Sequence, residues 1–283
     1  MDDIERKLWN RVDRFVWWLR FVPFLRMVAV CNNLSFSKGT SEKLPSAAST
    51  ASLPCRRIGN TAVASTPCFL AYGSFSGVPK VDDDSDIDLF IVARAGRLFI
   101  VRSFSILILH VLGVRLHGKK IKGRFCLSFF IDDTALDLSK IAISRDLYLA
   151  FWIKSLVPIF DDGVSDELIA ANFWAKSYFD SDDDFKIRKN RLRANNSMVK
   201  KFLNYLLSGS FGDFVERKLL NWQKDRARRK AQSITGENVS LIIEDHILKF
   251  HHHDRRRDFS EKWVKAYGEN AKLNDERFLS LWR

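Results

Sequence analysis

The run Ile87 to Ala93 (IDLFIVA) constrains the fold of this chain more than any other feature. It consists almost wholly of apolar residues, several of them β-branched or aromatic, and so predicts a short strand buried on both faces. Two carboxylates, Asp86 and Asp88, stand at its start. Because alternate side chains of a strand point to the same face, both carboxylates point one way while Ile87 and Leu89 enter the core. The fold must therefore bury this strand and still hold two acids side by side at its beginning.

Apolar segments on both sides of this strand predict an α/β domain. Phe24 to Cys31 and Phe125 to Ile131 have the composition of buried strands. Residues 2–20 carry apolar side chains at helical spacing and end before Pro23, and residues 98–113 form a second, strongly apolar helical segment. Strands that alternate with helices are typical of an α/β fold, which we place at residues 1–163.

The remainder of the chain predicts helices. Residues 145–160 have a helical pattern that closes at Asp162-Gly163. From residue 164 onward only helical patterns follow, at 165–179, 197–208, 211–234 and 258–267. We therefore expect an all-helical domain at residues 164–283.

The segment between the first two predicted strands has a different composition. Residues 38–67 are rich in Ser, Thr, Ala and Pro and lack apolar periodicity, which is typical of a flexible insertion. The tripeptide Ser-Phe-Ser occurs at 35–37 and again at 74–76. This repeat suggests that residues 38–76 entered an older strand-loop-strand unit.

Charge is unevenly distributed along the chain, whose formal net charge is +12. Between Lys186 and Lys230 there are 14 lysines and arginines and three acids, whereas Val81 to Asp88 holds five aspartates and no base. A basic half beside an acidic pocket suits an enzyme that handles polyanions with divalent cations, and RNA is one such partner. A solvated helical surface would show the same composition, so both interpretations stand at this point.

Neither a membrane span nor an exported protein is predicted. The apolar stretch 98–114 is shorter than the roughly 20 residues that a spanning helix needs, and it contains Arg102 and His110. No cleavable apolar segment follows the acidic start MDDIERK, and the four cysteines show no CxxC spacing. We therefore expect a cytoplasmic protein with reduced thiols and no membrane partner.

The residues that carry chemistry form one motif. Gly73-Ser74 is followed by eleven residues and then by Asp86-Ile87-Asp88, with Ser85 directly before the first acid. Two neighbouring carboxylates suit a hard divalent cation such as Mg²⁺, which prefers oxygen ligands. Glycine lets the backbone approach a phosphate closely, and a serine hydroxyl can bind its oxygens.

This arrangement resembles the nucleotidyltransferase fold of the DNA polymerase beta-like superfamily, in particular its minimal bacterial-type domains. The resemblance covers about residues 8–160 and rests on Tyr72-Gly73-Ser74 and on Ser85 to Leu89. It implies a short mixed sheet and two Mg²⁺ ions, replaceable by Mn²⁺, held by Asp86 and Asp88. It also implies that Gly73, Ser74 and Ser85 bind a nucleoside triphosphate such as ATP. The implied reaction transfers a nucleoside monophosphate to an acceptor and releases pyrophosphate.

The sequence departs from this family in two places. Met27 to Cys31 is an alternative for the strand that leads into the phosphate loop, with Asn32-Asn33 then standing where Gly-Ser usually stands. The family also carries a third carboxylate on the strand after the helix, but residues 125–131 contain no acid. Among Asp132, Asp133 and Asp137, which follow that strand, we take Asp137 as the candidate third carboxylate. If none reaches the metals, the alternative is a catalytically silent module that binds nucleotide or nucleic acid.

Two further clusters are interpreted as surface features. Ser181 to Asp184 lacks an upstream glycine and a following strand, so it resembles a linker or a helix start. His251 to His253 are consecutive and cannot all face one metal ion on regular secondary structure.

Overall fold

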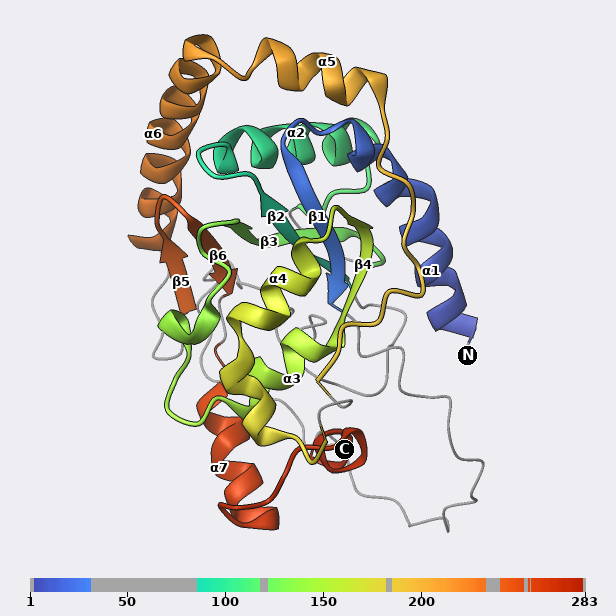
Figure 1. Ribbon diagram of the computed structural model, residues 1–283, viewed down its shortest axis with the longest axis vertical. Coiled ribbons are helices and arrows are strands. Elements are labelled where there is room, and N and C mark those ends of the chain that lie inside the picture. Colours follow the sequence, from blue (N-terminus) through green and yellow to red (C-terminus); the bar gives the residue numbers. More distant parts are fainter. Residues whose placement is uncertain are drawn as a thin grey trace, which may run out of the picture.

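A six-stranded mixed sheet forms the centre of the computed structural model (Figure 1). The structure describes residues 3–31, 86–117, 122–181, 185–232, 240–251, 254 and 256–281. The strand order is β4-β1-β2-β3-β6-β5. The strands are β1 (Leu25–Cys31), β2 (Ile87–Ala93), β3 (Phe125–Asp132), β4 (Leu156–Asp161), β5 (Ser240–Ile243) and β6 (Ile247–His251). The expected mixed α/β class is thus confirmed.

Helices pack on both faces of this sheet. One face is covered by α1 (Asp3–Phe15), the 3₁₀ helix η1 (Val16–Phe21), α2 (Leu98–Val111) and α6 (Ser210–Gln232). The other face is covered by η5 (Leu138–Ile141), α3 (Leu147–Ser155), α4 (Val164–Ala171), η6 (Phe173–Tyr178), α7 (Arg256–Tyr267) and α8 (Asp275–Ser280). The remaining helix, α5 (Met198–Leu206), crosses one end of the molecule before α6 begins (Figure 1).

The central strands take the form that their composition predicts. Every residue of β2 is buried, and the strand lies between β1 and β3. β1 runs antiparallel to β2, whereas β3 runs parallel to it, with α2 as the crossover. Because β2 and β3 are parallel, their first residues meet at one end of the sheet, and Asp88 lies opposite Cys126.

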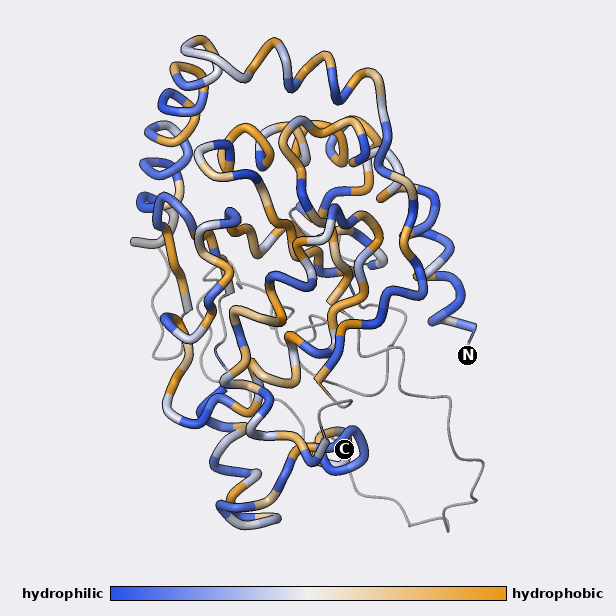
Figure 2. Tube along the Cα trace, in the orientation of Figure 1, coloured by the Kyte–Doolittle hydropathy of each residue, from blue (hydrophilic) through white to orange (hydrophobic). Residues whose placement is uncertain are grey.

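Each face of the sheet has its own apolar core, and Figure 2 shows hydrophobic residues along the strands. On the α3 face the rings of Phe90, Phe129 and Trp152 lie with their centroids 5.1–5.3 Å apart. Aromatic pairs at this separation gain energy beyond their buried area. This cluster fixes α3 over the middle of β2 and β3.

The helix predicted over residues 145–160 is too long. α3 ends at Ser155, and Leu156–Asp161 forms β4, which pairs with β1 at the edge of the sheet. Pro158 lies within β4 and has no N–H to donate, which an edge strand tolerates. The apolar run continues from helix into strand without a break, so periodicity alone does not separate them.

The C-terminal part is not all-helical. β5 and β6 form an antiparallel hairpin, and β6 pairs with β3, so they extend the sheet that begins before residue 163. Both strands are short apolar runs, SLII and ILKFH, and such runs are ambiguous between helix and strand.

The apolar segment at 98–114 is a buried helix. Among the described residues no helix combines the length and apolar character needed to cross a membrane. Instead, α2 packs between the sheet and α6, and the buried Glu216 of α6 accepts hydrogen bonds from the N–H groups of Phe99 and Ile100, both at 2.8 Å. These bonds satisfy two of the N–H groups that every helix start leaves open. α6 therefore fixes α2, and with it the parallel placement of β2 and β3.

Candidate functional site

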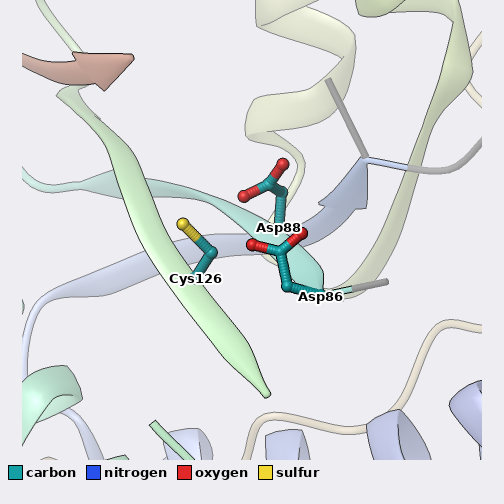
Figure 3. Close-up of side chains that lie close together, drawn as sticks. All are labelled: Asp86, Asp88 and Cys126. Carbon is teal, nitrogen blue, oxygen red and sulfur yellow. The ribbon is translucent and has the colours of Figure 1, made fainter. Parts of the chain in front are cut away.

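Asp86, Asp88 and Cys126 converge at the end of the sheet where β2 and β3 begin (Figure 3). One ligand atom from each residue lies within 4.8 Å of the others. Asp88 is only 3% exposed, and Asp86 and Cys126 are partly buried. The structure thus brings together the two acids that the sequence singles out, with a thiol as the third donor.

Strand register explains why a cysteine stands beside the acids. Asp88 pairs with Cys126 across the parallel ladder, and the Ser128 hydroxyl donates to Asp88 Oδ1 at 3.4 Å. Positions 126 and 128 are therefore the places on β3 where a third carboxylate would reach the pair. Neither residue is an acid.

The pKa of each thiol beside the acid pair is raised, mainly by burial and next by the charges of the two carboxylates. Burial is the main cause of the raised pKa of Cys126, followed by the negative charges of Asp88 and Asp86. Cys31, at the end of β1 on the other side of β2, has its pKa raised in the same way. Both thiols are therefore protonated near neutral pH, and the negative charge of the site resides on the acids.

These donors fit a hard divalent cation. Two carboxylates held this close repel one another, and a cation between them turns the repulsion into attraction. Mg²⁺ and Mn²⁺ bind through carboxylate oxygens together with substrate phosphates, whereas a protonated thiol is a poor ligand for either. Asp86 and Asp88 would hold such an ion, and Cys126 would contribute least.

The acids that follow β3 lie elsewhere. Asp132 is the last residue of β3, six residues beyond Cys126 and thus about 20 Å along the strand. Asp133 accepts hydrogen bonds from Arg26 and from the Ala95 N–H. Asp137 caps η5 by accepting from the Ser139 N–H at 3.0 Å, and no contact joins it to the Asp86 group in the described structure.

The residues expected to bind phosphates lie outside the described part of the chain. Gly73, Ser74 and Ser85 belong to this undescribed segment, as do both members of the alternative, Asn32-Asn33. The choice between the two phosphate loops therefore stays a prediction.

Lys249 is a buried cation that the sequence patterns do not single out. It lies on β6 opposite Phe129, which in turn pairs with Phe90, so all three point to the face that Asp88 occupies. It is 3% exposed and, in the described structure, makes no hydrogen bond or ion pair. Burial lowers its pKa to about 8, with smaller effects from neighbouring charges. A buried ammonium is costly, and the negative charges of Asp254 and Asp146 offset only part of this cost.

Much of the predicted basic region is already paired. Arg193 and Arg191 bind Asp13 at 2.7 and 3.5 Å, and Lys189 binds Asp166 at 2.7 Å. The basic side chains of residues 189–193 thus serve largely to attach that segment to the sheet domain.

A different set of arginines lies around α2: Arg102 packs over Phe130 and Phe250, on the face of the sheet opposite the acid pair. Burial lowers the pKa of Arg102 to about 10, with Arg115 and Arg226 lowering it further by repulsion. Arg115 pairs with Phe125, the residue before Cys126. Arg102 and Arg115 lie outside residues 186–230, where the basic partner surface was expected. Of these three arginines, Arg115 is the one with an electrostatic interaction with a site residue, Cys126.

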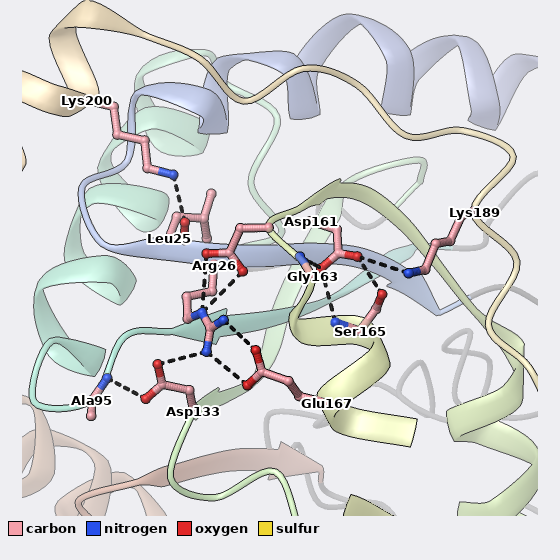
Figure 4. A network of polar contacts seen from close by, with 11 residues as sticks. Leu25, Arg26, Ala95, Asp133, Asp161, Gly163, Ser165, Glu167, Lys189 and Lys200 are labelled. Atoms are coloured by element: carbon pink, nitrogen blue, oxygen red, sulfur yellow. Dashed lines mark hydrogen bonds and ion pairs between the residues drawn. The ribbon is translucent and has the colours of Figure 1, made fainter. Parts of the chain in front are cut away.

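The far end of the sheet has a neutralised cluster instead. Arg26 is held by Asp133, Asp162 and Glu167 at 3.1, 3.2 and 2.8 Å (Figure 4). A cavity of about 310 Å³ lies beside it. Because three carboxylates surround Arg26, this cluster is a structural brace rather than an anion site.

Comparison with protein-family models, with curated proteins and with solved structures found no match to this chain. The geometry of the site therefore carries the functional argument by itself.

Replacing Cys126 with aspartate tests the metal site directly. Cys126→Asp adds a charged oxygen within reach of Asp86 and Asp88, so Mn²⁺ affinity should rise by about tenfold or more, since an added charge at this distance contributes several kcal/mol. Titration of free Mn²⁺ by electron paramagnetic resonance measures the change. Cys126→Ser is the matched control and should change little. Equal affinities for all three proteins would show that no cation binds among these residues.

Proposed function

We propose that this chain is a divalent-cation-dependent nucleotidyltransferase that moves a nucleoside monophosphate from a triphosphate to an acceptor and releases pyrophosphate. The observation that carries the proposal is the convergence of Asp86 and Asp88 at the start of a fully buried strand, beside a parallel strand. This is the arrangement on which the sequence resemblance rests.

Each group of the chain has a defined part in the proposed reaction. Asp86 and Asp88 would hold the cations, which would neutralise the charge of the triphosphate and the charge that develops at the α-phosphorus. The oxygen of the acceptor hydroxyl bonds to the α-phosphorus, the bond from that phosphorus to pyrophosphate breaks, and the hydroxyl proton leaves to water. Lys249, buried on the same sheet face, supplies positive charge toward the triphosphate.

A polyanionic acceptor such as RNA fits the surroundings of the site. Arg115 lies beside the first residue of β3 and close enough to Cys126 for an electrostatic interaction. Burial is the main cause of its lowered pKa, and repulsion by Arg226 lowers that pKa further. Guanidinium groups bind phosphates in a planar, two-pronged manner, which makes arginine suited to nucleic-acid backbones.

One observation favours the second candidate, a silent module that binds nucleotide without turnover. Positions 126 and 128 on β3 hold Cys and Ser where a third carboxylate would assist deprotonation of the acceptor. The two candidates share the binding site and differ in pyrophosphate release. A wild-type protein that binds triphosphate but releases no pyrophosphate with any RNA acceptor would select the silent module.

Calorimetric titration with each nucleoside triphosphate tests the proposed site. Wild type should bind the triphosphate in the presence of Mg²⁺ or Mn²⁺. The double variant Asp86→Asn/Asp88→Asn should show no metal-dependent heat of binding, because the cation then has no carboxylate ligands. Asp137→Asn is the control: it should match wild type if Asp137 acts only as a helix cap, and it should weaken binding if it is the third carboxylate. If wild type binds no nucleoside triphosphate with either metal, the proposal is contradicted.

Lys249 yields a pH-dependent prediction. Its folded pKa of about 8 lies below the 10.5 of an ordinary lysine, so below about pH 8 the folded protein bears the full cost of burying the ammonium. Lys249→Met removes the charge and should raise the free energy of unfolding by about 3 kcal/mol at pH 7, an advantage that shrinks as the pH rises from 8 toward 10.5. Urea unfolding across this pH range measures the difference.

Two controls separate stability from function. Lys140→Met changes an exposed lysine on η5 and should leave stability nearly unaltered. Lys249→Arg retains the charge and should retain triphosphate affinity that Lys249→Met loses. A Lys249→Met protein less stable than wild type at pH 7 would show that Lys249 is compensated within the fold.

A further inference from the structure

The helix α5 is attached to the protein by its polar side. The Lys200 ammonium donates to the Leu25 carbonyl oxygen at 2.7 Å, and Asn204 Oδ1 accepts from the Phe24 N–H at 2.8 Å (Figure 4 shows the lysine). Burial lowers the pKa of Lys200 to about 8. No residue of α5 is buried, so hydrogen bonds rather than an apolar face anchor this helix to the start of β1.

The apolar side of α5 faces outward. At about 100° per residue, Met198, Phe202 and Leu206 lie on the side opposite Lys200 and Asn204. Phe202 is 64% exposed and Tyr205 is 82% exposed. Figure 2 shows hydrophobic and hydrophilic positions alternating along this helix, which lies at the outer end of the molecule. This orientation is the reverse of a helix that covers a globular core.

The first turn of α6 continues this surface. Phe211 and Phe214 are more than half exposed. Gly212 packs against the backbone of the buried Leu207, where a Cβ would overlap the Leu207 carbonyl oxygen, so the corner between the helices is fixed. The α5–α6 patch consists of Met198, Val199, Phe202, Tyr205, Leu206, Phe211 and Phe214.

The charges beside the α5–α6 patch are positive. Lys201, Arg217 and Lys218 are exposed and make no ion pair in the described structure, and the Lys218 ammonium lies 5.5 Å from the Phe214 ring centroid. The nearby acid Asp213 is paired with Arg97 at 2.7 Å. Exposed cations on a chain with net charge +12 would repel a second copy at this surface and attract an anionic one.

We propose that the α5–α6 patch lies on the surface of an anionic lipid membrane. α5 lies in the plane of the interface, its apolar side chains enter the boundary between head groups and acyl chains, and the cations contact lipid phosphates. This peripheral contact needs no spanning helix, and it differs from the expectation of no membrane partner that was drawn from the sequence. It is independent of the proposed function, because β1 separates the patch from the acid pair by about 20 Å.

Flotation of the full chain with vesicles tests the membrane contact. Wild type should float with vesicles of equal parts phosphatidylglycerol and phosphatidylcholine, and far less with phosphatidylcholine alone. Phe202→Ser should weaken binding about tenfold or more, because one buried aromatic side chain is lost from the interface. Phe173→Ser is the matched control: Phe173 is 66% exposed and lies on η6, on the opposite face of the sheet. It should bind like wild type.

Charge reversal gives a second, independent variant. Lys201→Glu/Lys218→Glu should weaken binding to the anionic vesicles by about tenfold or more and should not alter the fold. Wild type that stays with the soluble fraction, or Phe173→Ser that loses as much binding as Phe202→Ser, would overturn the proposal. A third result would also overturn it: wild type does not bind vesicles but sediments as a dimer, and Phe202→Ser sediments as a monomer. The patch would then bind a second copy of the chain.

Discussion

The parallel pairing of β2 with β3 is the constraint on which the rest of the structure depends. It places the beginnings of both strands at one end of the sheet, so that Asp86 and Asp88 meet the side chain of Cys126. The crossover helix α2 that makes this pairing possible is itself held by Glu216 on α6. The acid pair therefore depends on contacts that extend from the first helices to the second half of the chain.

The central part of the fold follows from the composition and the hydrophobic periodicity of the sequence. β1, β2, α2 and β3 lie where apolar runs and helical spacing place them, since each is long and flanked by clear breaks. β4 was not predicted because Leu156–Asp161 continues the apolar run of α3, and only Pro158 marks the change. β5 and β6 were not predicted because runs of four and five residues show no clear hydrophobic periodicity. They are strands because β6 pairs with β3 and β5 pairs with β6.

The candidate site was predictable only where local sequence determines it. Two acids at i and i+2 on a strand must share a face, and they do. The sequence showed that residues 125–131 lack an acid, and strand register now identifies Cys126 and Ser128 as the positions beside Asp88. The burial of Lys249 could not be predicted, because it arises from the tertiary packing of β6. In the sequence, Lys249 belongs to a charged stretch that resembles solvated surface. Arg115 lies near Cys126 because an isolated bridge joins it to Phe125, a pairing that no linear pattern indicates.

Metal location tests the central claim most directly. Crystals grown with Mn²⁺ and a non-hydrolysable nucleoside triphosphate, measured near the manganese absorption edge, give the position of every bound ion by anomalous scattering. The site proposed here requires an anomalous peak between the carboxylates of Asp86 and Asp88, with the triphosphate completing the ligand set. An ordered triphosphate bound elsewhere, or a manganese peak distant from both acids, would contradict it.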